Sequence, residues 1–304
     1  MNRVVLIGGL GRSGTNLARR IVGSHSRIAM SPVEFKYYEH LQGGKSVRQI
    51  LTREKFVSRF PLDVSDLYSA PPDQVFRDLL SRYAESVGKP IAGEKSPGNE
   101  LFYPVIMNSL KDFDVRFIHL FRNPFDVTAS FKHAPFRKQE NHDRPLQDIA
   151  KYAEGWKRSL SLGLARALFQ PQAYCLVKYE DLTNDSVNTT ARLCEFLDVD
   201  FERDRMLSLS DFSKHRDNTS FSDPGIAKSP GVDDNTGRVH ALESRKGYLT
   251  EKEIQLVGSI CGEMAKAIGY EDEDFNAVPS KGMAYGDRVR RNIGRRIANK
   301  FFKR

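Results

Sequence analysis

Cysteine is scarce in this chain, and its three cysteines match no metal or disulfide pattern. They stand apart at Cys175, Cys194 and Cys261, each in an apolar stretch, and none belongs to a Cys-x-x-Cys pair. This spacing excludes a disulfide scaffold and a zinc ribbon. The seven histidines include no His-Glu-x-x-His or other ligand spacing, so the sequence predicts no metal site. We expect the thiols to pack in the core of a protein kept in a reducing cytoplasm.

Long apolar runs are missing too. No segment approaches the ~18 consecutive apolar residues of a membrane-spanning helix. Residues 1–10 have an apolar core too short for a signal peptide, and they continue into a glycine-rich segment without a small-residue cleavage site. We therefore expect a cytoplasmic protein without a membrane span.

An excess of one charge is absent from most of the chain. The formal net charge is +8, from 47 basic and 39 acidic residues. Nine of the basic residues but a single acid fall in residues 276–304, so residues 1–275 are neutral. A broad basic surface for nucleic acid is therefore not predicted.

The basic tail has a helical pattern. Val289, Ile293, Ile297 and Phe301 stand four apart with Arg and Lys between them, which predicts an amphipathic helix. Such a helix can make a peripheral contact with an anionic membrane through residues 280–304, pack on its own domain, or join a dimer. We expect a main domain over residues 1–275 and a separate tail over residues 276–304.

Strands alternate with helices in the main domain. Short runs rich in Val, Ile and Phe predict four buried strands, at residues 4–7, 91–92 with their flanks, 115–121 and 173–179. Apolar spacings of three and four predict helices over residues 149–164 and, after a capping box at Thr250, up to Gly269. Residues 35–90 are expected to be helices covering one side, and residues 211–247 a lid-like polar loop. The alternation predicts a three-layer α/β fold, with helices on both faces of a central parallel sheet.

The first strand leads into a glycine-rich turn and a helix. In such a unit backbone N–H groups and a helix N-terminus converge on an anion. Gly9 and Gly14 fit the glycine spacing of the Walker A loop, but Thr15 stands where that loop requires Lys. Gly9, Gly11 and Gly14 also meet Gly-x-Gly-x-x-Gly, although no acid follows at the distance of a dinucleotide site.

A second strand-turn-helix unit begins with Arg122-Asn123-Pro124. Ser130 stands eight residues after Arg122, which brings a strand-end guanidinium and a helix hydroxyl toward one pocket. Arg at this place can hold a phosphate with two parallel hydrogen bonds. Asp126 can cap the following helix.

The two units together resemble sulfotransferases that use 3′-phosphoadenosine 5′-phosphosulfate (PAPS). Gly11-Arg12-Ser13-Gly14-Thr15 looks like the 5′-phosphosulfate loop of that family, and Arg122 with Ser130 like its 3′-phosphate motif. The resemblance implies a P-loop-like nucleotide site, PAPS as cofactor, 3′-phosphoadenosine 5′-phosphate (PAP) as product and no metal. The implied cofactor-binding residues are Gly11, Arg12, Ser13, Gly14, Thr15, Asn16, Arg122, Ser130, Tyr179, Ser220, and Arg245 or Lys246.

The resemblance also implies catalytic groups. Arg12 and Lys95, in the segment Gly93-Glu94-Lys95-Ser96-Pro97, correspond to residues near the transferred group. The small-molecule branch of the family places a base His two residues after this Lys, where this chain has Pro97. The carbohydrate and tyrosyl-protein branches use a Glu 21–22 residues beyond the basic residue of the first loop, a position that matches Glu34. Glu34 is the expected general base, with Glu39 and His40 as weaker substitutes.

The acceptor and two alternative functions remain open. A Glu base favours a carbohydrate, glycolipid or protein-tyrosine hydroxyl over small phenols, and a sugar or glycolipid is the preferred expectation. A P-loop-like kinase or NTPase would need Lys after Gly14 and an acid at the strand end that Arg122 occupies. A non-catalytic nucleotide-binding protein would keep Arg122 and Ser130 without needing Glu34 or Lys95.

Overall fold

Five parallel strands form the centre of the molecule. In a computed structural model, described over residues 3–134, 144–208 and 244–276, they form one sheet in the order β2-β3-β1-β4-β5. The strands are β1 (Arg3–Gly8), β2 (Ile28–Met30), β3 (Ile91–Lys95), β4 (Asp114–Phe121) and β5 (Tyr174–Lys178). Val4 of β1 lies beside Ala92 of β3 and Val115 of β4. The carboxyl ends of all five strands therefore meet at one edge of the sheet.

The central strand is apolar along its length because both of its faces are covered. Val4 and Leu6 belong to one hydrophobic core, while Val5 and Ile7 belong to another. All four side chains are fully buried. A parallel strand covered on both faces is typically such a continuous apolar run.

The first face of the sheet is covered by helices from residues 37–109. They are α2 (Tyr37–Gln42), α3 (Val47–Leu51), α4 (Glu54–Val57), α5 (Pro72–Ser86) and α6 (Tyr103–Ser109), with short 3₁₀ turns η1 (Ser65–Ser69) and η2 (Asn99–Phe102). Aromatic side chains fill the space between these helices. The Phe35 ring lies 5.9 Å from Phe56 and 6.0 Å from Phe76 between centroids.

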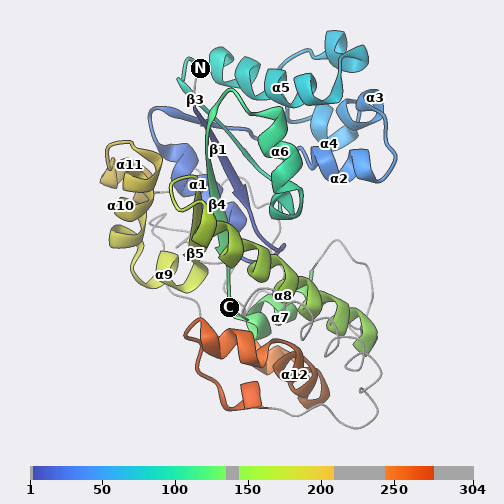
Figure 1. The fold of residues 1–304 in the computed structure, drawn as a ribbon, viewed down its shortest axis with the longest axis vertical. Helices are drawn as coiled ribbons and strands as arrows, with labels where there is room; N and C mark the ends of the chain where they lie inside the picture. Colours follow the sequence, from blue (N-terminus) through green and yellow to red (C-terminus); the bar gives the residue numbers. More distant parts are fainter. Residues whose placement is uncertain (1–2, 135–143, 209–243, 277–304) are drawn as a thin grey trace, which may run out of the picture.

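The second face is covered by α1 (Thr15–Ser24), α9 (Tyr179–Asn184), α10 (Ser186–Leu197) and α11 (Arg203–Leu207). Figure 1 shows these helices and the first group on opposite sides of the strands. This arrangement confirms the predicted three-layer α/β fold with a parallel sheet.

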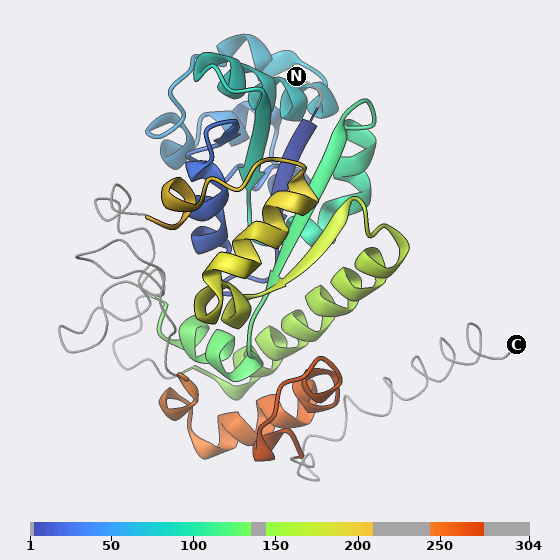
Figure 2. The same ribbon diagram turned by 90° about the vertical axis from the view of Figure 1, so that its left-hand side faces the viewer.

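A third core lies at the carboxyl edge of the sheet. It joins α7 (Pro124–Lys132), α8 (Leu146–Phe169) and α12 (Glu251–Ala267) around buried residues such as Phe125, Trp156 and Val257. The Thr250 hydroxyl accepts from the backbone N–H of Glu253, which forms the predicted capping box. The 3₁₀ turns η4 (Lys246–Tyr248) and η5 (Glu273–Asn276) flank α12, and Figure 2 shows this last part beneath the sheet.

Three details differ from the predictions. The sheet has a fifth strand, β2, whose three residues are too few for a recognisable pattern. The cap of α7 is the Asn123 side chain, which accepts from the N–H of Phe125 at 2.9 Å, and not Asp126. The last helix ends at Ala267, two residues before Gly269. The predicted tail from residue 277 on, and residues 211–243 of the predicted loop, lie outside the described residues.

Candidate active site

A cavity of about 540 Å³ opens at the carboxyl edge of the sheet. Residues that follow all five strands line it. They are Arg12 after β1, Glu34 after β2, Lys95 at the end of β3, Arg122 after β4 and Tyr179 after β5. Ligands of open parallel sheets bind outside the carboxyl ends of the strands, so this cavity is the natural place for a functional site.

The loop after β1 has a backbone that demands glycine at Gly14. Its φ is +94°, and a Cβ there would lie 2.1 Å from Cδ2 of Tyr179. Arg12 also has a positive φ, of 72°. The Tyr152 hydroxyl donates to the Gly11 carbonyl at 2.5 Å, which holds the outer side of the loop. The loop thus leads directly to the N-terminus of α1, where Thr15 and Asn16 line the cavity.

The two sequence motifs meet through a side-chain hydrogen bond. Arg12 Nε donates to Ser130 Oγ at 3.0 Å, across 118 positions of sequence. Burial lowers the pKa of Arg12, and the neighbouring Arg122 lowers it further. Two guanidinium groups that repel each other in this way favour an anion between or beside them.

Arg122 is a buried cation that can donate a hydrogen bond to a ligand. It is 3% exposed, and its guanidinium carbon lies 4.4 Å from the centre of the Tyr179 ring. One terminal nitrogen contacts Asp126 Oδ2 at 3.3 Å. Its Nε has no hydrogen-bond partner within the described part of the chain. A buried N–H without a partner is costly, so this atom indicates an acceptor group on a ligand.

The structure separates Arg245 from Lys246. Arg245 lines the cavity, and burial together with Arg122 lowers its pKa to about 10. The backbone N–H of Arg245 donates to Asp126 Oδ1 at 2.6 Å, so the carboxylate that contacts Arg122 also positions Arg245. Lys246 instead contacts Asp272 Oδ1 at 2.5 Å and Asp274. Of the two residues, Arg245 belongs to the cavity and Lys246 does not.

Glu34 and Lys95 form an ion pair in the cavity wall. Lys95 is 1% exposed, and its ammonium donates to Glu34 Oε1 and, at 2.5 Å, to Asn16 Oδ1. Burial would raise the pKa of Glu34, but the adjacent ammonium holds it below its usual range. Burial lowers the pKa of Lys95, against the opposing effect of Glu34. The pair places a carboxylate and an ammonium beside the start of α1.

Glu94 is a positioning residue that the sequence did not single out. It is fully buried, accepts from the N–H of Phe35 at 2.9 Å and from Asn99 Nδ2 at 2.7 Å, and also contacts the Ser96 hydroxyl. Burial raises its pKa. These bonds fix the segment that carries Glu34 against the end of β3. A carboxylate next to Lys95 in a short buried strand was the available signal.

Most of the predicted site residues come together here. Those that line the cavity are Gly11, Arg12, Gly14, Thr15, Asn16, Glu34, Lys95, Arg122, Ser130, Tyr179 and Arg245. Ser13 lies behind them, buried, with its N–H donating to the Leu10 carbonyl at 3.2 Å. Ser220 lies outside the described residues. Across residues 3–134, 144–208 and 244–276, no cluster of three His, Cys, Asp or Glu is placed to hold a metal, and no helix has the length and apolarity to cross a membrane.

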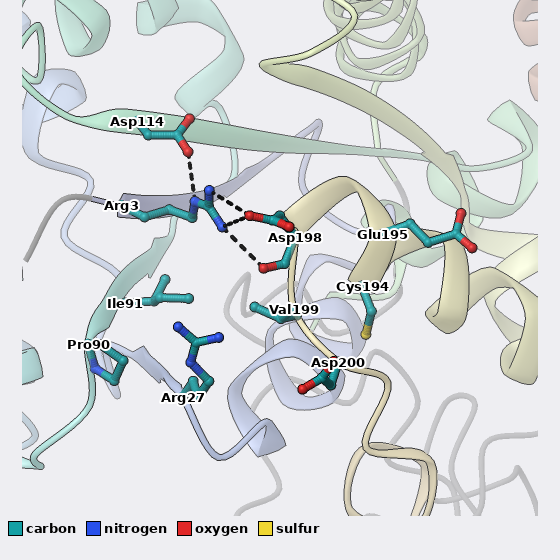
Figure 3. Close-up of a pocket in the computed structure, with 10 residues that line it drawn as sticks. All are labelled: Arg3, Arg27, Pro90, Ile91, Asp114, Cys194, Glu195, Asp198, Val199 and Asp200. Carbon is teal, nitrogen blue, oxygen red and sulfur yellow. Dashed lines mark hydrogen bonds and ion pairs between the residues drawn. The ribbon is translucent and has the colours of Figure 1, made fainter.

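A second cavity, of about 790 Å³, lies at the opposite edge of the sheet (Figure 3). Arg3 at the start of β1 donates to Asp114 Oδ2 at 2.7 Å and to Asp198 Oδ2 at 3.1 Å. These bonds join β1 to β4 and to the end of α10. Figure 3 shows the Arg3 guanidinium turned toward these two carboxylates. Arg3 therefore has a structural role, away from the carboxyl ends of the strands that carry the candidate site.

Known proteins resemble this chain over most of its length. A family model described as "Sulfotransferase family" matches residues 5–203. A flavonol 3-sulfotransferase of Flaveria bidentis is 23% identical over 253 residues, covering 72% of this chain and 76% of the relative. A flavonol 4′-sulfotransferase of Flaveria chlorifolia is 26% identical over 167 residues, half of this chain and 49% of the relative.

Solved structures share the fold. The sulfotransferase domain of the Synechococcus PCC 7002 olefin synthase superposes with a TM-score of 0.52 at 20% identity, covering 89% of this chain and 96% of that domain. A mouse sulfotransferase complexed with PAP gives 0.50 at 15% identity, covering 87% and 84%. Since the family model spans well over half of the sequence, including both strand-turn-helix units, the chain belongs to the sulfotransferase family.

Proposed function

We propose that the protein transfers a sulfuryl group from PAPS to a hydroxyl of a carbohydrate or glycolipid acceptor, with Glu34 as the general base. The contact of Glu34 with Lys95, next to Asn16 at the start of α1, carries the proposal. It sets a proton acceptor and a cation at the point where the anion-binding loop meets the rest of the cavity. Sulfuryl transfer needs both groups at one place, by analogy with phosphoryl transfer.

The residues present fit PAPS. The Nε of Arg122 is buried without a partner among the described residues, and the Tyr179 ring packs directly against Gly14. Arg122, Ser130 and Arg245 would hold the 3′-phosphate, and Gly11–Asn16 the 5′-phosphosulfate. Likeness to a mouse sulfotransferase complexed with PAP supports this assignment. When bound, PAPS supplies an activated sulfuryl group, and PAP is the leaving group.

Each catalytic side chain has a role that follows from its surroundings. Glu34 is held ionised by Lys95, so its carboxylate can accept the proton of the acceptor hydroxyl. Lys95 and Arg12 would stabilise negative charge that develops on the bridging oxygen of the leaving phosphate. Asn16 and Glu34 both accept from Lys95 and so orient its ammonium.

The kind of base indicates the class of acceptor. Pro97 lines the cavity at the position where the small-molecule branch has its His. The flavonol sulfotransferases are named for phenolic substrates, but they are no more than 26% identical to this chain. A transfer screen with radiolabelled PAPS over sugars, glycolipids, tyrosyl peptides and flavonols tests the choice. Transfer to flavonols alone would overturn the carbohydrate proposal.

A kinase or NTPase is the competing function, and nucleotide preference distinguishes it from a sulfotransferase. A thermal-shift comparison of PAP with ATP plus Mg²⁺ measures that preference. We expect stabilisation by PAP, because Arg122, Ser130 and Arg245 suit a 3′-phosphate that ATP lacks. Stabilisation by ATP alone would reject the sulfotransferase mechanism proposed here.

Residues 1–275 are proposed as the catalytic part, and residues 276–304 as an attachment element for a membrane or another surface. The excess of basic residues in the tail supports this division. Deleting residues 280–304 should leave PAP affinity unchanged in a calorimetric titration, while binding to anionic vesicles is lost. Loss of PAP affinity in the truncated protein would contradict the division.

A further inference from the structure

The strand order divides the cavity into two halves. Arg12, Arg122 and Tyr179 follow β1, β4 and β5, which lie side by side in the sheet. Glu34 follows β2, at the far edge, and Lys95 ends β3 between them. The proposed nucleotide contacts therefore occupy one half. The other half, beyond the Glu34–Lys95 pair, is left for the acceptor.

The acceptor half is basic. Its lining comes from α2, α4 and the adjoining turns, and it contributes Lys36, Arg53, Lys55 and Arg59, which we name the acceptor cluster. Glu34 is the one acid among the described residues that line the cavity. The proposed nucleotide site has its own cations, so the acceptor cluster is not needed to explain PAPS binding.

The cations of the acceptor cluster are held toward the cavity by the fold. Arg53 Nη2 donates to the Phe35 carbonyl at 2.7 Å, and its Nε to the Ile50 carbonyl at 2.8 Å. These bonds go to neutral carbonyls. Burial lowers the pKa of Arg53, and the carboxylates of Glu39 and Glu34 oppose that shift without reversing it. Nη1 contacts His40 Nε2 at 2.5 Å, and burial together with Arg53 lowers the pKa of His40 to about 4. His40 is therefore a neutral partner at physiological pH.

Lys55 belongs to α4, and Arg59 lies two residues beyond the end of that helix. Phe56 and Phe60, each the next residue in sequence, are buried and stack at 4.9 Å between ring centroids. Anchoring these rings in the core leaves Lys55 and Arg59 exposed at the cavity. A solvated helix surface usually mixes both signs of charge. Here Lys36 contacts Glu39 at 3.9 Å, but neither Glu39 nor Glu54 lines the cavity. Within the described part of the lining, Glu34 is the one acid beside the four cations of the acceptor cluster.

We infer that the acceptor carries an acidic group, a carboxylate, sulfate or phosphate, near the hydroxyl that receives the sulfuryl group. This inference rests on the proposed function and narrows its acceptor. An anionic acceptor is repelled by the cofactor phosphates and by Glu34, and the acceptor cluster offsets that repulsion. Cations at a cavity mouth also raise the local concentration of an anionic substrate.

The test measures binding to PAP-saturated protein, because PAP occupies the cations of the nucleotide half. The probes are a hyaluronan tetrasaccharide, which carries two glucuronates, and the neutral chitotetraose, both labelled with uncharged 2-aminobenzamide. We expect at least about tenfold tighter binding of the acidic probe, and about tenfold loss of it in the double variant Lys55→Gln/Arg59→Gln. Glucose 6-phosphate and glucose 6-sulfate, set against glucose as competitors, show whether phosphate or sulfate replaces carboxylate.

The matched control is Lys45→Gln, an exposed lysine on the same helical cover that does not line the cavity. It should bind the acidic probe as the unmodified protein does, and all variants should keep their PAP affinity. Failure of the unmodified protein to bind PAP sinks the proposed function and this inference with it. PAP binding without preference for the acidic probe, or an equal loss in Lys45→Gln, overturns this inference alone.

Discussion

Arg12 and Ser130, from two motifs 118 positions apart, are joined by a hydrogen bond of 3.0 Å from the guanidinium Nε to the hydroxyl. Arg12 belongs to the loop after β1 and Ser130 to α7, which follows the neighbouring strand β4. The bond therefore links two segments that line the cavity. The two halves of the anion site are therefore coupled. A change at Ser130 should be felt by any ligand that Arg12 holds.

Replacing Ser130 with alanine tests the proposed contact of its hydroxyl with the 3′-phosphate. We expect Ser130→Ala to weaken PAP about tenfold, because it removes one hydrogen-bonding group beside a charged partner. Calorimetry with PAP and with adenosine 5′-monophosphate, which lacks the 3′-phosphate, measures the effect. PAP should lose more affinity than the monophosphate. An equal loss for both nucleotides would argue against a 3′-phosphate contact.

Glu34→Gln separates catalysis from binding. We expect kcat to fall by roughly 10²–10⁴, with PAP affinity within about threefold of normal, since an amide cannot take the acceptor proton but keeps the side-chain volume. The neighbouring Glu39→Gln, exposed and outside the cavity lining, should turn over normally. Loss of PAP binding with turnover in Glu34→Gln would refute the role of base, and loss of turnover only in Glu39→Gln would transfer it.

The pH profile should report the Glu34–Lys95 pair. The base works when ionised, and Lys95 depresses the pKa of Glu34, so activity is lost only as pH falls through a value below the usual carboxylate range. We expect kcat/KM to be flat from pH 7 to about pH 5. In Lys95→Met the burial of Glu34 is no longer offset, and the acid limb should move to higher pH. An acid limb unchanged in that variant would contradict the pairing.

The fold was predictable where the sequence pattern was long or strongly apolar. β1 is buried on both faces from its second residue on, and α8 and α12 run for 24 and 17 residues, long enough to show helical spacing. β2 has only three residues and was missed. Its place at the sheet edge comes from pairing with β3, which is a tertiary contact with no local signal.

The site was predictable because its residues cluster at strand ends, where short motifs remain visible. Glu34 and Lys95 were expected from two separate segments, but nothing local shows that they touch. The role of Asp126 was misread, because its acceptors serve Arg122 and the N–H of Arg245, far along the chain, and not its own helix. The bond between the N–H of Phe35 and Glu94 likewise joins residues that lie far apart in the sequence. Such contacts depend on how the helices pack against the sheet, which no local pattern shows.

Gly14→Ala should damage the loop even without nucleotide. A Cβ at φ +94° is strained, and it would lie 2.1 Å from the Tyr179 ring, which also packs against the Arg122 guanidinium at 4.4 Å. We expect a loss of about 2–4 kcal/mol in the free energy of unfolding, measured with urea. Gly11→Ala is the matched control, because its Cβ would meet Tyr152 at an ordinary 3.7 Å. It should cost less than about 1 kcal/mol. Equal losses in the two variants would show that the ring does not pack against Gly14.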